Sequence, residues 1–294
     1  MFLLKLQEKG LVNCPKWLPN NTAYLVMMGS IAYGCSSDSS DVDVYGVVVP
    51  PKHDVFPHLR GEILGFGRQK KRFEQWQEHH IKDKESRKQY DFQIFSIVKY
   101  FHLLMMCNPN LVDSIYVPQR CILHITNVGQ IIRENRKLFL SKKAWHTFKG
   151  YSFQQMHKMS YKNPLGKRRE TVEKYGFDLK FAYHIVRLLN EVEQILTEED
   201  LDLERNREQL KAIRRGDWTE PQVREYFQTK ERELESLYTK SSLRHSPDEA
   251  AIKELLLQCL EHHYGSLDKA VVVEGRDREI LRQIKALCER AGVE

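Results

Sequence analysis

The sequence predicts an α+β protein, in which a mixed module of strands and helices is followed by a helical domain. Two stretches near the N-terminus, 23–28 and 42–49, are rich in β-branched and aromatic residues, which is typical of strands. From about residue 125 onward the apolar residues recur with a helical period instead. These helical segments are 125–145, 168–197, 201–215, 220–240 and 247–262. We therefore expect a first domain at 1–145 and a helical second domain at 146–294.

The composition is that of a folded protein without a membrane segment. The chain has 294 residues, of which 41% are hydrophobic, and a formal net charge of +6. That charge suits a polyanionic partner or a nucleoside triphosphate and does not distinguish between them. Six cysteines occur without a CxxC pair, so neither a disulfide framework nor a zinc site is expected. No window holds the roughly 18 apolar residues of a spanning helix, and "MFLL" is too short for a signal peptide. We expect a cytoplasmic protein.

The N-terminal module is expected to alternate between strands and helices. An amphipathic helix over 1–10 ends at Gly10, and the Ser/Asp cluster after Gly34 forms a turn between the first two strands. The charged stretch 67–89 has few apolar residues at any period, which indicates a loop or an exposed ribbon. The alternating stretch 90–97 predicts a third strand.

The segments after this strand carry the signals of helix ends. An apolar helix over 98–107 stops at Pro109, because the residue before a proline avoids the helical conformation. In the second domain, Ser246-Pro247-Asp248-Glu249 has the form of a capping box with proline at the first helical position. Thr219 followed by Gln222 forms a second, weaker capping box.

The segment "MMGSIAYGCSSDSSDVDVYGVVVP", residues 27–50, carries the most chemistry. Residues i and i+2 of a strand point to one face, so Asp41 and Asp43 project together while Val42 and Val44 face the core. Two adjacent carboxylates repel each other unless a cation lies between them, and magnesium prefers such oxygen ligands. Two-metal phosphoryl transfer also needs a third carboxylate.

Two further features complete this expected site. Asp91, at the start of the third strand, is the best placed residue for the third carboxylate. The Gly29-Ser30 turn allows the backbone to approach a phosphate closely, and Ser30 adds a hydroxyl group and an N–H donor.

A polar stripe on the predicted helix 176–196 is the second candidate for binding. Lys180, His184, Arg187 and Glu191 share one face of this helix. Beside a magnesium–triphosphate site, Lys180 and Arg187 are expected to contact phosphate and His184 to donate or accept a hydrogen bond. A solvated helix face and internal pairing remain open. By contrast, the pairs His79-His80 and His262-His263 lack the spacing of metal ligands on a helix, and we expect them in solvent.

The motif "MGS…DVDV" resembles the signature of the DNA-polymerase-β-like nucleotidyltransferase superfamily. More closely, residues 27–50 resemble the RlaP/YcgL-like family, described as an RNA-repair-pathway polymerase-β family. The resemblance continues through "IFSIVKYFHLLMMCNPNLVDSIY" and "KRRETVEKYGFDLKFAYHIVRLLNE". It implies a small mixed sheet backed by helices, followed by the helical domain, with Asp41, Asp43 and Asp91 as the ligands of two magnesium ions.

The resemblance also implies a reaction. The enzyme would transfer a nucleoside monophosphate from a nucleoside triphosphate, with ATP favoured, to an acceptor hydroxyl, and pyrophosphate would leave. RNA is the favoured acceptor, either a tRNA or a damaged tRNA end, because of the family description. Two alternatives stay open: an adenylyltransferase that modifies protein side chains, and a non-catalytic sensor of nucleotide or RNA.

Overall fold

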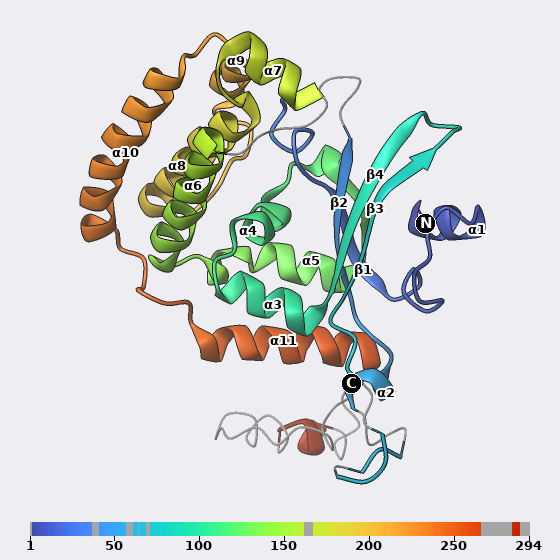
Figure 1. Ribbon diagram of the computed structural model, residues 1–294. Coiled ribbons are helices and arrows are strands. Elements are labelled where there is room, and N and C mark those ends of the chain that lie inside the picture. Colours follow the sequence, from blue (N-terminus) through green and yellow to red (C-terminus); the bar gives the residue numbers. More distant parts are fainter. Residues whose placement is uncertain are drawn as a thin grey trace.

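The computed structural model describes residues 2–36, 41–56, 61–63, 65–68, 71–161, 167–265 and 284–288. Its centre is a five-stranded mixed sheet in the order β3-β4-β2-β1-β5 (Figure 1). The central strands β2 and β4 are parallel, and every other neighbouring pair is antiparallel. The expected mixed sheet is therefore confirmed. The strands are β1 Thr22–Met27, β2 Val42–Val48, β3 Gln75–Asp83, β4 Lys88–Ser96 and β5 Ile122–Ile125.

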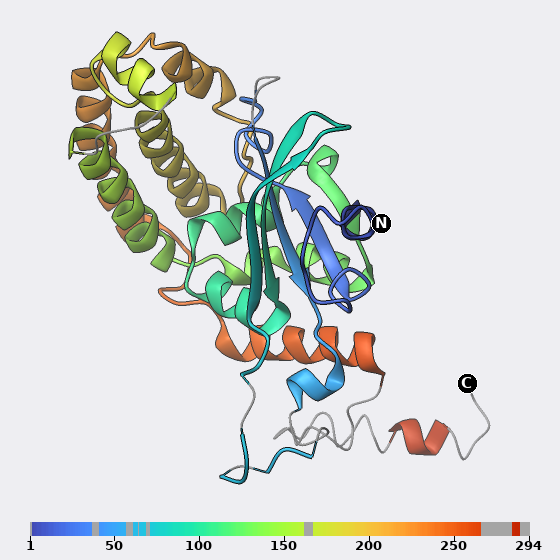
Figure 2. The same ribbon diagram turned by 45° about the vertical axis from the view of Figure 1, so that its right-hand side comes forward.

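Helices cover the two faces of the sheet unequally. Among the described helices, the short α1 (Phe2–Glu8) lies on one face, and α3 (Ile97–Met105), α4 (Pro109–Tyr116) and α5 (Asn127–Glu134) lie on the other (Figures 1 and 2). Val42 and Val44 of β2 belong to the hydrophobic cluster under α1. Because side chains alternate along a strand, Asp43 faces the side of the three helices.

The helices of the second part pack beside this layer. They are α6 (Lys143–Tyr161), α7 (Lys167–Tyr175), α8 (Leu179–Glu198), α9 (Arg207–Arg215) and α10 (Glu220–Lys240). The next helix, α11 (Glu249–Tyr264), turns back and packs against α3 and α5 (Figure 1). It therefore does not lie with the other helices of the expected domain at 146–294. No helix in the described ranges is long and apolar enough to cross a membrane.

The structure decides between the two alternatives for one stretch and differs from the expectations for others. Of the loop or exposed ribbon expected over 67–89, it shows a ribbon at Gln75–Asp83, where β3 pairs with β4 as the outer hairpin of the sheet. The segment 125–145 is not one helix but is divided among α5, a 3₁₀ turn at Arg136–Phe139 and the start of α6. The segment 168–197 is interrupted at Gly176, whose φ of +82° no helix accepts. Two other short elements are α2 (Lys52–Val55) and the 3₁₀ turn Gln119–Cys121.

The helix caps confirm one expectation and correct another. The Thr219 hydroxyl group accepts a hydrogen bond from the Gln222 N–H, and the Gln222 side chain accepts one from the Thr219 N–H. The second capping box is therefore present. The first is shifted: Asp248, not Ser246, caps α11 by accepting from the N–H of Ala251 at 3.1 Å. Asp248 is itself a strong N-cap residue, and the helix begins after it.

Candidate active site

Asp43 and Asp91 are direct partners in the register of the parallel strands β2 and β4. Both carboxylates are partly buried, while Asp41, immediately before β2, is exposed. Strand pairing places the side chains of register partners within a few ångströms of each other on one face of the sheet. The structure thus brings together the acidic residues that the sequence predicted from two separate strands.

The Gly29 turn lies against this carboxylate pair. It follows β1, and the N–H of Met28 donates to the carbonyl of Asp43 at 2.7 Å. Gly29 has a φ of +63°, and a Cβ atom at this position would overlap the Asp43 carboxylate. Within the turn, the N–H of Cys35 donates to the Ser30 carbonyl at 2.8 Å. Glycine is therefore required at position 29 both by conformation and by space.

Like charges lie close to the Asp43 carboxylate. Burial raises the pKa of Asp43, and the charges of Asp91 and Asp41 raise this pKa further, whereas Lys180 and His79 oppose the shift. The oxygen donors suit magnesium, and the mutual repulsion of the carboxylates is what a bound cation would relieve. Within the described part of the chain, however, no group of three or more His, Cys, Asp or Glu side chains is already arranged to hold a metal ion.

Asp91 has neighbours that the sequence did not indicate. A register shift in β3 between Glu78 and Ile81 lets the N–H of His80 donate to Asp91 Oδ1 at 2.6 Å. Nδ1 of His79 lies 3.8 Å from the same oxygen. Both histidine side chains are largely in solvent, as expected, with 46% and 77% of their surface exposed. Only the strand pairing, which a single sequence does not reveal, places them beside the carboxylate.

Helix α8 brings Lys180 toward the carboxylates. Asp178 caps the helix and accepts from the N–H of Lys180 at 2.9 Å. The Lys180 side chain is exposed, and its charge acts on Asp43. His184, one turn later, is partly buried, with its ring 5.0 Å from that of Tyr183. A phosphate contact by either residue stays a prediction.

Arg187 occupies a place different from the expected one. Its side chain is 5% exposed, and its Nη1 atom donates to Tyr33 at 2.8 Å, to Glu191 at 2.9 Å and to Asp113. The open alternative of internal pairing therefore describes Arg187 and Glu191. Arg187 was expected to contact phosphate. Its guanidinium is instead buried and bound by the carboxylate of Asp113, which is far away in the sequence.

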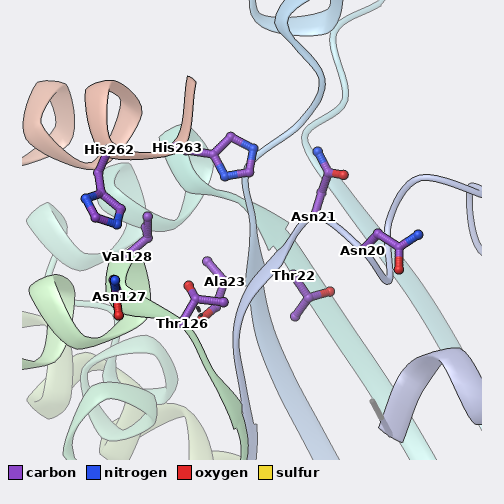
Figure 3. Close-up of a pocket in the computed structure, with 9 residues that line it drawn as sticks. All are labelled: Asn20, Asn21, Thr22, Ala23, Thr126, Asn127, Val128, His262 and His263. Atoms are coloured by element: carbon purple, nitrogen blue, oxygen red, sulfur yellow. Dashed lines mark hydrogen bonds between the residues drawn. The ribbon is translucent and has the colours of Figure 1, made fainter. Parts of the chain in front are cut away.

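A cavity at the other end of the sheet is separate from this site. It has a volume of about 390 Å³ and lies where Thr22 begins β1, next to the start of α5 and the end of α11 (Figure 3). None of the sequence-predicted site residues lines it. The lining is Asn20, Asn21, Thr22, Ala23, Thr126, Asn127, Val128, His262 and His263.

One protein family matches most of the chain. No curated protein matches the chain. A solved structure, a nucleotidyltransferase-like protein from Exiguobacterium sibiricum 255-15, is 13% identical, with 82% of this chain and 68% of that chain covered and a TM-score of 0.28. The profile of RlaP, the RNA repair pathway DNA polymerase beta family, matches residues 7–258. The chain therefore belongs to this family and is a nucleotidyltransferase of the polymerase beta type, with the corresponding α+β core and a helical C-terminal region.

Proposed function

We propose that the protein is a magnesium-dependent nucleotidyltransferase that transfers NMP from an NTP, most readily ATP, to a hydroxyl group of RNA. The observation that carries the proposal is the register pair Asp43 and Asp91, which lies against the glycine turn at Gly29. Carboxylates on adjacent strands beside a backbone turn fit the binding of a cation and a phosphate at one point. The description of the family as an RNA repair pathway family supports RNA as the acceptor, and a tRNA or a damaged tRNA end is the acceptor that we propose.

Each residue of the site has a distinct part in this reaction. Asp41, Asp43 and Asp91 would hold magnesium, which supplies charge neutralisation for the triphosphate and lowers the pKa of the attacking hydroxyl when bound. The backbone of Gly29 and Ser30 would bind phosphate oxygens. The acceptor oxygen forms a bond with the α-phosphorus as the bond to the β-phosphate oxygen breaks, and pyrophosphate leaves.

Residues of α8 would bind the same substrate. The charge of the exposed Lys180 ammonium group lowers the pKa of Asp43. The same charge would attract a phosphate group beside this carboxylate. His184 would supply a hydrogen bond one turn further along the helix. Lys180 and His184 would therefore bind the nucleotide, and neither takes part in proton transfer.

The surface next to the glycine turn suits a polyanionic acceptor. Arg214 of α9 donates a hydrogen bond to the carbonyl of Cys35, at the end of that turn. The segment 205–215, "RNREQLKAIRR", contains five basic residues and one acidic residue. Four of these basic side chains pair with only three carboxylates, those of Glu198, Glu208 and Asp217. The remaining excess of positive charge would attract an RNA backbone at low salt. The protein is expected in the cytoplasm, since its six cysteines are unpaired.

Incubation with each labelled NTP and magnesium, with and without total tRNA, tests the proposal. Label in RNA supports it. Label in protein would instead identify an adenylyltransferase for protein side chains. NTP binding without any transfer would identify a sensor and contradict the proposed reaction.

A further inference from the structure

A buried polar cluster connects helix α8 to the glycine turn of the active site. Its members are Tyr33 in that turn, Asp113 on α4, and Arg187 and Glu191 on α8. All four side chains are almost completely buried. Buried charges are costly unless they are paired, and these four side chains pair with one another. Two of their buried atoms, Asp113 Oδ1 and Arg187 Nε, have no hydrogen-bond partner among the described residues.

The hydroxyl group of Tyr33 is at the centre of the cluster. It donates to Asp113 Oδ2 at 2.6 Å and accepts from Arg187 Nη1 at 2.8 Å. The guanidinium carbon of Arg187 also lies 4.5 Å from the centre of the Tyr33 ring. Tyr33 is therefore fixed both at its ring and at its hydroxyl group.

Tyr33 belongs to the same turn as Gly29 and Ser30. Its N–H donates to the Gly29 carbonyl at 3.3 Å, and the Ser30 carbonyl accepts from Cys35 at 2.8 Å. A change in the position of Tyr33 must therefore move the backbone that lies against Asp43. The turn has no regular strand or helix of its own to hold it in place.

Arg187 fixes the other side of the site. It lies seven residues after Lys180 on α8, which corresponds to about 10 Å along the helix axis. Its bonds to Asp113 and Tyr33 set the rotation of α8 relative to α4, which lies between α8 and the sheet (Figure 1). Lys180, at the start of the same helix, is close enough for its charge to lower the pKa of Asp43.

We infer that Tyr33 and Arg187 are positioning residues for nucleotidyl transfer. Through one buried cluster they set the glycine turn and Lys180 relative to Asp43 and Asp91, and they do not touch the substrate. The inference rests on the proposed function for its effect on catalysis, but its effect on the turn is independent of any reaction.

Tyr33→Phe tests the inference, because it removes the hydroxyl group and keeps the buried ring. Tyr100→Phe is the matched control: Tyr100 on α3 is 1% exposed, and its hydroxyl group lies 2.5 Å from Ser114 Oγ, next to Asp113 on α4. Each substitution removes one buried hydroxyl group, and each partner side chain keeps another hydrogen bond. Only Tyr33 contacts the turn.

The first measurement is amide hydrogen exchange of residues 29–36 without nucleotide or metal. We expect exchange about ten-fold faster in Tyr33→Phe and unchanged in Tyr100→Phe, because local opening is governed by local contacts. Equal exchange in both variants would overturn the inference. This result is decisive even if the wild-type protein transfers no nucleotide, an outcome that would contradict the proposed function alone.

The second measurement is steady-state transfer well below the melting temperature. In Tyr33→Phe, kcat should fall by at least about ten-fold while KM for the NTP changes by less than about three-fold, since misalignment affects reaction more than binding. Tyr100→Phe should keep the wild-type kcat. A wild-type kcat in Tyr33→Phe, or an equal loss in both variants, would show that the cluster serves stability only.

Discussion

Asp43 and Asp91 lie side by side in the parallel pairing of β2 and β4, although the whole of β3 lies between them in the sequence. The backbone pairing of the two strands places these residues beside each other. The pKa of Asp43 is raised by burial and then by the charges of Asp91 and Asp41. The folded chain therefore keeps like-charged carboxylates close together here, and such clustering is typical of functional sites.

The first prediction concerns this repulsion. Asp91→Asn keeps an acceptor for the N–H of His80 and removes one negative charge. Transfer activity should fall at least about 100-fold, the usual scale for losing a group that stabilises transition-state charge. The melting temperature in a chelator should stay the same or rise, because a like charge is gone. Differential scanning fluorimetry and the transfer assay check the two parts, and a lower melting temperature with intact activity would contradict both.

The second prediction concerns the close contact at Gly29. Gly29→Ala places a methyl group where the Asp43 carboxylate lies, at a φ of +63°. Gly10→Ala is the control, because Gly10 has a φ of +67° with open space around its Cβ position. Both substitutions should lower the free energy of unfolding by about 1–2 kcal/mol through the left-handed backbone, and Gly29→Ala should lower it further because its methyl group must displace the Asp43 carboxylate. Only Gly29→Ala should abolish transfer. Equal transfer activity of Gly29→Ala and Gly10→Ala would show that the close approach of Gly29 to Asp43 has no role in the reaction.

The third prediction separates Lys180 from an ordinary surface lysine. Lys180→Ala should raise KM for the NTP about ten-fold, which corresponds to the loss of one charge-assisted contact to phosphate. Lys253→Ala on α11 removes an exposed lysine that pairs with Glu249 and should leave KM unchanged. Steady-state kinetics at fixed acceptor concentration measure both. Unchanged KM in Lys180→Ala would show that Lys180 is an ordinary solvated lysine.

The fourth prediction is a pH dependence of stability. Burial raises the pKa of Glu191 well above its usual value, Asp113 raises it further and Arg187 opposes the shift. Tyr33 and Tyr183 are the other titratable groups packed on Arg187. Since the folded-state pKa is the higher one, the stabilisation by protonated Glu191 is complete below the unfolded pKa of about 4.3 and is lost as the pH rises toward the folded-state value.

Glu191→Gln removes this titration and keeps a hydrogen-bond acceptor for Arg187. The free energy of unfolding of the variant should therefore fall less steeply with rising pH above about pH 5 than that of the wild type. Glu193→Gln, on the same helix but 36% exposed and paired with Lys230, should retain the wild-type dependence. Urea unfolding at a series of pH values measures these slopes. Parallel curves for Glu191→Gln and wild type would refute the prediction.

The carboxylate strand could be predicted because its information is local. The two-residue period of strands separates Asp41 and Asp43 from Val42 and Val44, and the valines do lie in the core under α1. Asp91 could be proposed from its place at the start of the next apolar strand, and the register of β2 and β4 places it beside Asp43. Whether these residues bind metal is still a prediction.

The remaining features depend on contacts between distant segments. Nothing near Arg187 indicates that Asp113 on α4 will bind it, so its burial could not be predicted from the helix alone. Strand β3 could be expected only as one of two alternatives, a loop or an exposed ribbon, because most of its residues are exposed. Its pairing with β4, and with it the position of His80 beside Asp91, comes from the backbone of the hairpin.

The magnesium dependence of transfer by Asp43→Asn tests the central claim most directly. Wild-type protein should transfer labelled NMP to RNA at a rate that rises with magnesium and disappears in excess chelator. Asp43→Asn, folded to the same extent by circular dichroism, should transfer none at any magnesium concentration. Full activity of Asp43→Asn, or wild-type transfer that persists in the chelator, would contradict the assignment of Asp43 and Asp91 as the metal-binding pair.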